Sequence, residues 1–166
     1  MVALAAAAGV GVYPETKHPS YFASIGLALE EPLLAALDAT DGRVFIQSFE
    51  ADNLRALRER TGHPLVRLTA GPPPDVEEIA TYADAIGPHK DQVVPRDADG
   101  RLGEPTTLVA DAHAAGLLVH PWTFRPEPGF VPAGMDAAAE LAAFYALGVD
   151  GVFADDPAAA VAARAS

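Results

Sequence analysis

Short apolar runs alternate along the chain with longer segments in which apolar residues recur every three or four positions. The runs predict β-strands over residues 10–13, 44–47, 65–68, 85–87, 117–122 and 151–153. The longer segments predict helices over residues 27–37, 50–60, 104–115 and 135–147, and two more that begin near Asp75 and Pro157. Strands that alternate with helices in this way predict a parallel sheet built of βα crossovers.

Six βα units fit two α/β architectures. An open, doubly wound sheet suits a chain of 166 residues, although no predicted strand is followed by a Gly-rich phosphate loop. The alternative is six-eighths of a (β/α)8 barrel, whose complete form typically needs about 250 residues. The pattern alone leaves both architectures open.

A helix-to-strand junction occurs three times in the sequence. Gly116 and Gly148 each stand between the predicted end of a helix and the start of a strand, a position that favours glycine. Gly9 follows an Ala-rich stretch in the same arrangement. By this analogy residues 1–8 are the end of a helix whose beginning is absent, and a chance Ala-rich terminus is the alternative.

Composition and charge exclude several classes of protein. Half of the residues are apolar, which is enough for one compact domain, and the formal net charge of -12 argues against a nucleic-acid partner. The chain has no cysteine, which excludes disulfides and thiolate metal sites. No apolar run approaches the roughly 20 residues of a membrane span. We therefore expect no nucleic-acid partner and no membrane span, while the compartment stays open between cytoplasm and export.

The end of the first predicted strand carries an acid and a base. Glu15 and Lys17 are two positions apart, so in an extended segment they project to the same side. In one interpretation they form an ion pair. In the other, Glu15 binds a hard divalent cation through oxygen and Lys17 contacts a phosphate.

Later strand ends add polar and aromatic candidates. Gln47 could donate to a phosphate or a ligand hydroxyl, while Phe49 is either an apolar wall or part of the core. Trp122 is the only Trp of the chain. It either lies beside a cleft that suits a sugar or glycerol backbone, or covers the core with its N–H bonded to a carbonyl. Asp155 or Asp156 is predicted to cap the last helix.

Taken in order, five segments resemble motifs of the glycerophosphodiester phosphodiesterase family. They are YPETK (13–17), VFIQSF (44–49), YADAIGP (82–88), HPWTFR (120–125) and GVDGVFADDP (148–157). The resemblance implies a (β/α)8 barrel that hydrolyses a glycerophosphodiester to glycerol 3-phosphate and an alcohol with Ca²⁺ or Mg²⁺. It also implies that Glu15 is a metal ligand and that Lys17, Gln47, Phe49 and Trp122 contact this small-molecule substrate.

The chain departs from the family pattern in its first strands. No H-R-G, E-N-T or E-x-D segment precedes the YPETK motif, so both catalytic histidines of the family and two of its three metal carboxylates are missing from the first strands. We therefore assign no catalytic residue. The expected fold is an incomplete TIM-like (β/α)8 barrel with six βα units, formed by a single, N-terminally truncated domain over residues 1–166.

These departures leave three functional hypotheses. The first is an enzyme of the phosphodiesterase type that is catalytically incomplete as this chain, and whose open barrel edges favour self-association. The second is a non-catalytic module that binds glycerol phosphate or supports another subunit. The third is an unrelated, doubly wound α/β protein.

Overall fold

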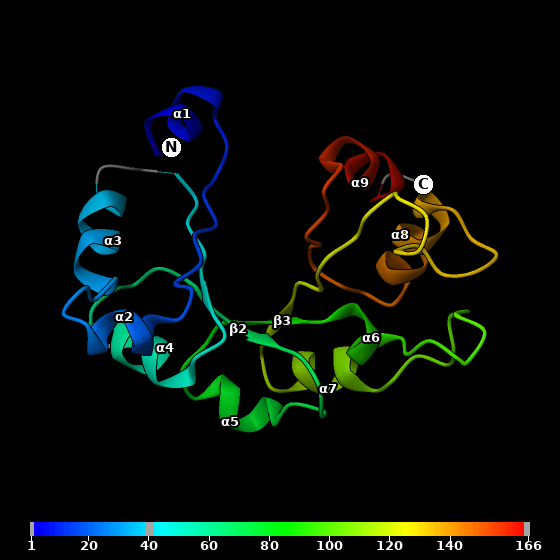
Figure 1. Ribbon diagram of the computed structural model, residues 1–166, viewed down its shortest axis with the longest axis horizontal. Helices are drawn as coiled ribbons and strands as arrows, with labels where there is room; N and C mark the ends of the chain where they lie inside the picture. The colour runs from blue at the N-terminus through cyan, green and yellow to red at the C-terminus, as the bar shows by residue number, and fades with distance from the viewer. Residues whose placement is uncertain (1, 39–41, 165–166) are drawn as a thin grey trace. The chain divides into compact units, whose positions relative to one another are not determined.

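The computed structural model describes residues 2–38 and 42–164 (Figure 1). The strands β1 (Ile46–Ser48), β2 (Leu65–Thr69), β3 (Ala85–Pro88) and β4 (Leu118–Val119) follow one another in this order in one sheet. The helices are α1 (Val2–Ala8), α2 (Pro19–Ser24), α3 (Glu30–Leu37), α4 (Ala51–Arg58), α5 (Val76–Ala80), α6 (Lys90–Val93), α7 (Leu108–Ala114), α8 (Ala137–Ala146) and α9 (Pro157–Arg164). Among the described residues, no helix has both the length and the apolar character that crossing a membrane requires.

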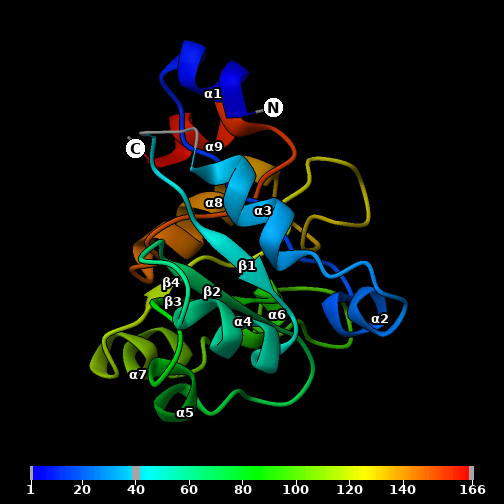
Figure 2. The ribbon, with the colours of Figure 1, turned by 90° about the vertical axis from the view of Figure 1, so that its left-hand side faces the viewer.

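The described residues divide into two compact units. The N-terminal unit comprises residues 2–38, 42–68 and 78–85, and the C-terminal unit comprises residues 69–77 and 86–164. The core of the N-terminal unit is a parallel strand pair, in which Ile46 of β1 lies opposite Leu65 of β2 and both are fully buried. α4 packs against β1 through a face that buries Leu54 and Leu57, three positions apart (Figure 2).

The helix predicted over residues 27–37 begins later than expected. α3 starts at Glu30, and Pro32 lies in its first turn, where the missing N–H of proline costs no intrahelical hydrogen bond. A separate helix, α2, precedes it and begins at Pro19.

The strand predicted over residues 10–13 is reduced to single parallel bridges. Val12 bridges Val44, and Glu15 bridges Gln47. Pro14 lies between these two bridges and has no N–H to donate. The segment therefore runs extended beside β1 without forming a continuous strand.

The C-terminal unit is built from helices around the ends of β3 and β4. α8 and α9 lie side by side (Figure 1), and α7 contacts both β4 and α6. Phe144 of α8 is fully buried and meets the Phe124 ring edge-on at 4.9 Å. Asp136 caps α8 and Asp156 caps α9, each accepting from a backbone N–H three residues on, at 2.8 and 3.0 Å. The predicted aspartate cap of the last helix is thus Asp156.

The last two predicted strands are shorter than the sequence indicates. β4 has two residues, and residues 151–153 form no strand. Asp150 N and Gly151 N both donate to Val119 O, at 3.0 and 3.4 Å, so two consecutive donors share one acceptor and the ladder is interrupted. Pairing resumes at a parallel bridge between Phe124 and Ala154.

A helix that ends in a glycine is present at all three predicted places, but only Gly116 leads into a strand, β4, within the described residues. Gly9, Gly116 and Gly148 follow helices and have φ angles of 67, 82 and 89°, the left-handed conformation that glycine adopts without a steric penalty. The helix predicted before Gly9 is α1. Met1, where that prediction begins, lies outside the described residues.

Candidate functional site

Backbone pairing places two of the predicted site residues side by side in the N-terminal unit. Thr16 N donates to Gln47 O at 3.0 Å, and Gln47 N donates to Pro14 O at 2.9 Å. This is a parallel register with Glu15 opposite Gln47. Residues opposite one another in parallel strands project to the same side, so the Glu15 and Gln47 side chains share a face.

Thr16, the residue between Glu15 and Lys17, points to the buried side, and its hydrogen bonds hold this segment in place. Thr16 is buried, and its Oγ1 donates to Asn53 Oδ1 at 2.6 Å. Ser48 Oγ donates to Thr16 O at 3.1 Å, and Asn53 Nδ2 donates to the Glu30 carboxylate. Thr16, Ser48, Asn53 and Glu30 were not predicted as site residues. Side chains alternate between the two sides of an extended segment, so the polar residue between Glu15 and Lys17 points to the buried side and needs hydrogen-bond partners there.

The outward face offers both charge and an unsatisfied acceptor. Glu15 and Lys17 are exposed, and within the described residues they form no ion pair with each other. Gln47 is buried, and its Oε1 has no hydrogen-bond donor in the described part of the chain. A buried acceptor without a partner is costly. The arrangement therefore favours a ligand that supplies a hydroxyl donor or a cation to Gln47.

Phe49 lies just past the end of β1 and is not part of the core. Its side chain is 41% exposed. Its carbonyl accepts a hydrogen bond from Arg67 Nη1, which holds the backbone at this strand end. Of the two interpretations of Phe49, the exposed apolar surface is the one that the structure supports.

The residues on this face fit a divalent cation only in part. Glu15 and Gln47 present oxygen atoms, which Ca²⁺ and Mg²⁺ prefer, but these ions take six or more ligands. Among the described residues, no group of three or more His, Asp or Glu side chains comes together as a metal centre requires. The described residues by themselves therefore do not make a complete metal centre.

Trp122 belongs to the C-terminal unit. Its Nε1 donates to Gly87 O at 2.7 Å, and its ring meets the His89 ring edge-on at 4.8 Å. The bond to a backbone carbonyl is the one expected of a tryptophan that covers the core. Trp122 also lines an open cavity of about 330 Å³, and that this cavity suits a sugar or glycerol backbone stays a prediction.

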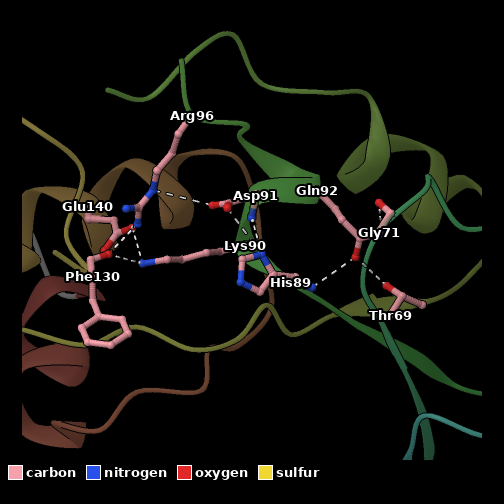
Figure 3. A network of polar contacts seen from close by, with 9 residues as sticks. All are labelled: Thr69, Gly71, His89, Lys90, Asp91, Gln92, Arg96, Phe130 and Glu140. Atoms are coloured by element: carbon pink, nitrogen blue, oxygen red, sulfur yellow. Dashed lines mark hydrogen bonds and ion pairs between the residues drawn. The ribbon is translucent and has the colours of Figure 1, made fainter. Parts of the chain in front are cut away.

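Lys90, which lines this cavity, also forms a buried ion pair with Glu140 (Figure 3). Lys90 Nζ donates to Glu140 Oε1 at 2.7 Å and to Phe130 O at 2.9 Å. The Lys90 and Glu140 side chains are only 6% and 1% exposed. Arg96 Nη2 also donates to Phe130 O and lies 3.4 Å from Glu140 Oε1. The network ties the loop around Phe130 to α6 and α8.

The short helix α6 positions Lys90. No helix was predicted from the sequence at these residues. Gln92 Oε1 accepts from His89 N at 3.1 Å and from Thr69 Oγ1 at 2.9 Å (Figure 3). His89 Nδ1 in turn accepts from Asp91 N at 3.3 Å. This reciprocal cap turns the chain directly after β3. The signal in the sequence was a glutamine three positions after a polar residue at a strand end.

His120 is a buried histidine of the C-terminal unit. Burial lowers the pKa of the His120 imidazole, while the nearby Asp150 carboxylate acts to raise that pKa. Gly151 packs so closely that an added Cβ would lie 3.1 Å from His120 Cδ2. The sequence analysis assigned His120 no role in catalysis.

Comparisons with known proteins agree on one family. A family model described as the glycerophosphoryl diester phosphodiesterase family matches residues 6–159. The glycerophosphodiester phosphodiesterase GDPD6 of Arabidopsis thaliana is 32% identical to this chain over an alignment of 192 positions. The alignment covers 93% of this chain and 51% of that protein. The chain therefore spans about half the length of this curated relative.

Two crystal structures assigned as glycerophosphoryl diester phosphodiesterases are similar in fold. The one from Agrobacterium tumefaciens C58 has a TM-score of 0.65 at 25% identity and covers 94% of this chain and 58% of that one. The one from Silicibacter pomeroyi DSS-3 has a TM-score of 0.61 at 22% identity, over 81% of this chain and 43% of that one.

Proposed function

The chain belongs to the glycerophosphoryl diester phosphodiesterase family, and from this premise we propose that its residues serve the hydrolysis of glycerophosphodiesters to glycerol 3-phosphate and an alcohol. Family membership also decides the architecture. The fold is an incomplete TIM-like α/β barrel, and the doubly wound alternative is excluded. That residues 1–166 form a single, N-terminally truncated domain stays a prediction, as does self-association through open barrel edges.

The proposal rests on the shared face of Glu15 and Gln47. An exposed carboxylate stands opposite a buried amide whose Oε1 has no donor among the described residues. Both groups present oxygen to the same side, which suits Ca²⁺ or Mg²⁺ whose other ligands come from water, substrate or residues outside this chain. Glu15 is the proposed metal ligand, and the cation would polarise the phosphoryl oxygens when bound.

The other predicted residues have chemistry that suits the rest of the substrate. Lys17 carries an exposed ammonium that can meet a phosphate as a point charge. Gln47 Oε1 is an acceptor and therefore suits a glycerol hydroxyl better than a phosphate oxygen. Phe49 presents exposed apolar ring surface, which suits the carbon backbone of glycerol. Trp122 belongs to the C-terminal unit, and its contact with the substrate stays a prediction.

We propose further that these 166 residues bind the ligand without turning it over. General acid–base catalysis needs a group that can exchange a proton within hydrogen-bond reach of the reacting atoms. The H-R-G and E-x-D segments that carry such groups in the first strands of the family do not precede YPETK in this sequence. We therefore expect this chain to bind the ligand but not to hydrolyse it.

Calorimetry of glycerol 3-phosphate, with and without Mg²⁺ or Ca²⁺, tests the site. Lys17→Ala should weaken binding about tenfold, the effect of losing one charge-assisted hydrogen bond. Glu15→Gln should remove the enhancement by metal. Arg43→Ala and Glu59→Gln delete the same charges elsewhere on the exposed surface of the N-terminal unit and should leave binding unchanged.

Two results would contradict the proposal. If the unmodified chain does not bind glycerol 3-phosphate, or if Lys17→Ala binds as well as the unmodified chain, the assigned site is wrong. If the chain hydrolyses glycerophosphocholine efficiently when Mg²⁺ or Ca²⁺ is added, it is catalytically complete despite the missing segments.

A further inference from the structure

We propose that the cavity of about 330 Å³ beside Trp122 is an oxyanion site for the phosphate group of a small ligand. The cavity is lined entirely by the C-terminal unit. Anion binding there is therefore independent of Glu15 and Lys17 and of the function proposed for them.

The charges that line the cavity are mostly positive. Lys90, Arg96 and Arg125 line it together with one carboxylate, that of Asp91. Such a lining is unusual in a chain whose formal net charge is -12 and which has 11 Lys and Arg residues in total. A concave lining of one dominant sign concentrates the potential within it and attracts the opposite charge.

The carboxylates that balance these cations lie outside the lining. Glu140 contacts Lys90 and Arg96 and is not among the residues that line the cavity (Figure 3). Asp155 pairs with Arg125, its Oδ2 lying 3.1 Å from Arg125 Nε. These contacts hold the cations in place without filling the cavity. A preorganised donor set of this kind loses little side-chain entropy when an anion binds.

Hydrogen-bond donors outnumber acceptors around the cavity. Lysine has three N–H donors and arginine has five, and neither side chain can accept. Lys90 Nζ donates to two acceptors among the described residues. Arg96 uses Nη2 for its two hydrogen bonds. Its buried Nε has no hydrogen-bond partner in the described part of the chain, and Asp91 Oδ1 lies 3.6 Å from it. An excess of donors requires a ligand rich in acceptors.

A phosphate group is a ligand rich in hydrogen-bond acceptors. It brings several acceptor oxygens and negative charge, and it matches the planar donor fork of arginine. Arg125 lies over the Phe130 ring at 4.8 Å, which fixes its guanidinium at the edge of the cavity. The Trp122 ring beside these cations provides an apolar wall for the organic part of a phosphate monoester.

Calorimetric titration of the full chain with inorganic phosphate, at low ionic strength, tests the site. We expect Arg96→Gln and Arg125→Gln each to weaken phosphate binding about tenfold, because each removes one charged donor group. Arg101→Gln is the matched control, since it deletes the same charge from an exposed pair with Asp99 outside the cavity. A melting curve for each variant confirms that it folds.

A parallel titration with glycerol 3-phosphate separates free phosphate from a phosphate monoester as the ligand. The inference is supported if either ligand binds the unmodified chain and loses about tenfold in both cavity variants. It is overturned if Arg96→Gln and Arg125→Gln change the affinity for both ligands no more than Arg101→Gln does. A loss confined to Lys17→Ala would place the only bound anion in the N-terminal unit, refuting this inference while supporting the proposed function.

Discussion

The two units use charged residues in opposite ways. In the N-terminal unit, Glu15 and Lys17 are neighbours in sequence and share a face of an extended segment, yet they stay exposed and form no ion pair with each other. In the C-terminal unit, Lys90 and Glu140 lie 50 positions apart and form a buried pair at 2.7 Å. Closeness in sequence is therefore a poor guide to which charges meet.

The physical reason is the cost of burying charge. An exposed charge keeps its hydration and remains available to a ligand, whereas a charge taken out of water needs a partner to offset the lost solvation. The N-terminal pair thus suits recognition, and the C-terminal pair holds the loop around Phe130 in place. This difference can be tested by removing one charge from each.

The largest effect is expected at the buried pair. Lys90→Met leaves the Glu140 carboxylate buried without its closest cation, and we expect a loss of about 3–5 kcal/mol in the free energy of unfolding. The double variant Lys90→Met/Glu140→Met should recover most of that loss, because both charges are then gone. Urea denaturation measures both variants. Equal destabilisation by the single and double variants would show that packing, and not the unpaired charge, is responsible.

A smaller effect is expected from the buried imidazole of the C-terminal unit. Burial lowers the pKa of His120, so below the unfolded pKa of about 6.5 the unfolded chain binds a proton that the folded chain does not. The contribution of His120 to stability is therefore complete above this pH and is lost as the pH falls below it. Melting temperatures between pH 7.5 and 5 should fall less steeply in His120→Asn than in the unmodified chain.

His18 provides the matched control for that experiment. It is exposed and has a φ angle of 53°, a conformation that asparagine tolerates well. His18→Asn should leave the pH dependence of the melting temperature as it is in the unmodified chain. If His120→Asn also leaves it unchanged, the buried imidazole does not control acid stability.

The smallest effect is expected at the exposed pair. Glu15→Gln and Lys17→Ala should each change the free energy of unfolding by less than about 0.5 kcal/mol, as surface substitutions usually do. Urea denaturation alongside the Lys90 variants makes the comparison direct. A loss of more than about 1 kcal/mol in either variant would show that these charges stabilise the fold, and the contrast between the units would fail.

Much of the local structure could be read from the sequence. The predicted strands over residues 65–68 and 85–87 match β2 and β3 to within one residue at each end, and the junction glycines and the Asp156 cap lie where expected. These features depend on side-chain periodicity and backbone preference, which act over a few residues. The ordered motifs also identified the family.

Only the tertiary structure decided where pairing stops and which polar groups meet. Residues 10–13 and 151–153 have the composition of strands, but Pro14 and the shared acceptor Val119 O interrupt their ladders. The Thr16–Asn53 hydrogen bond and the Lys90–Glu140 pair each join segments far apart in the chain. Gln47 Oε1 is buried with no donor among the described residues, which also follows from the tertiary fold. Such contacts depend on how the chain crosses itself, and no local pattern encodes that. That Glu15 and Lys17 mark a functional strand end stays a prediction, and the structure shows both residues exposed with no ion pair between them.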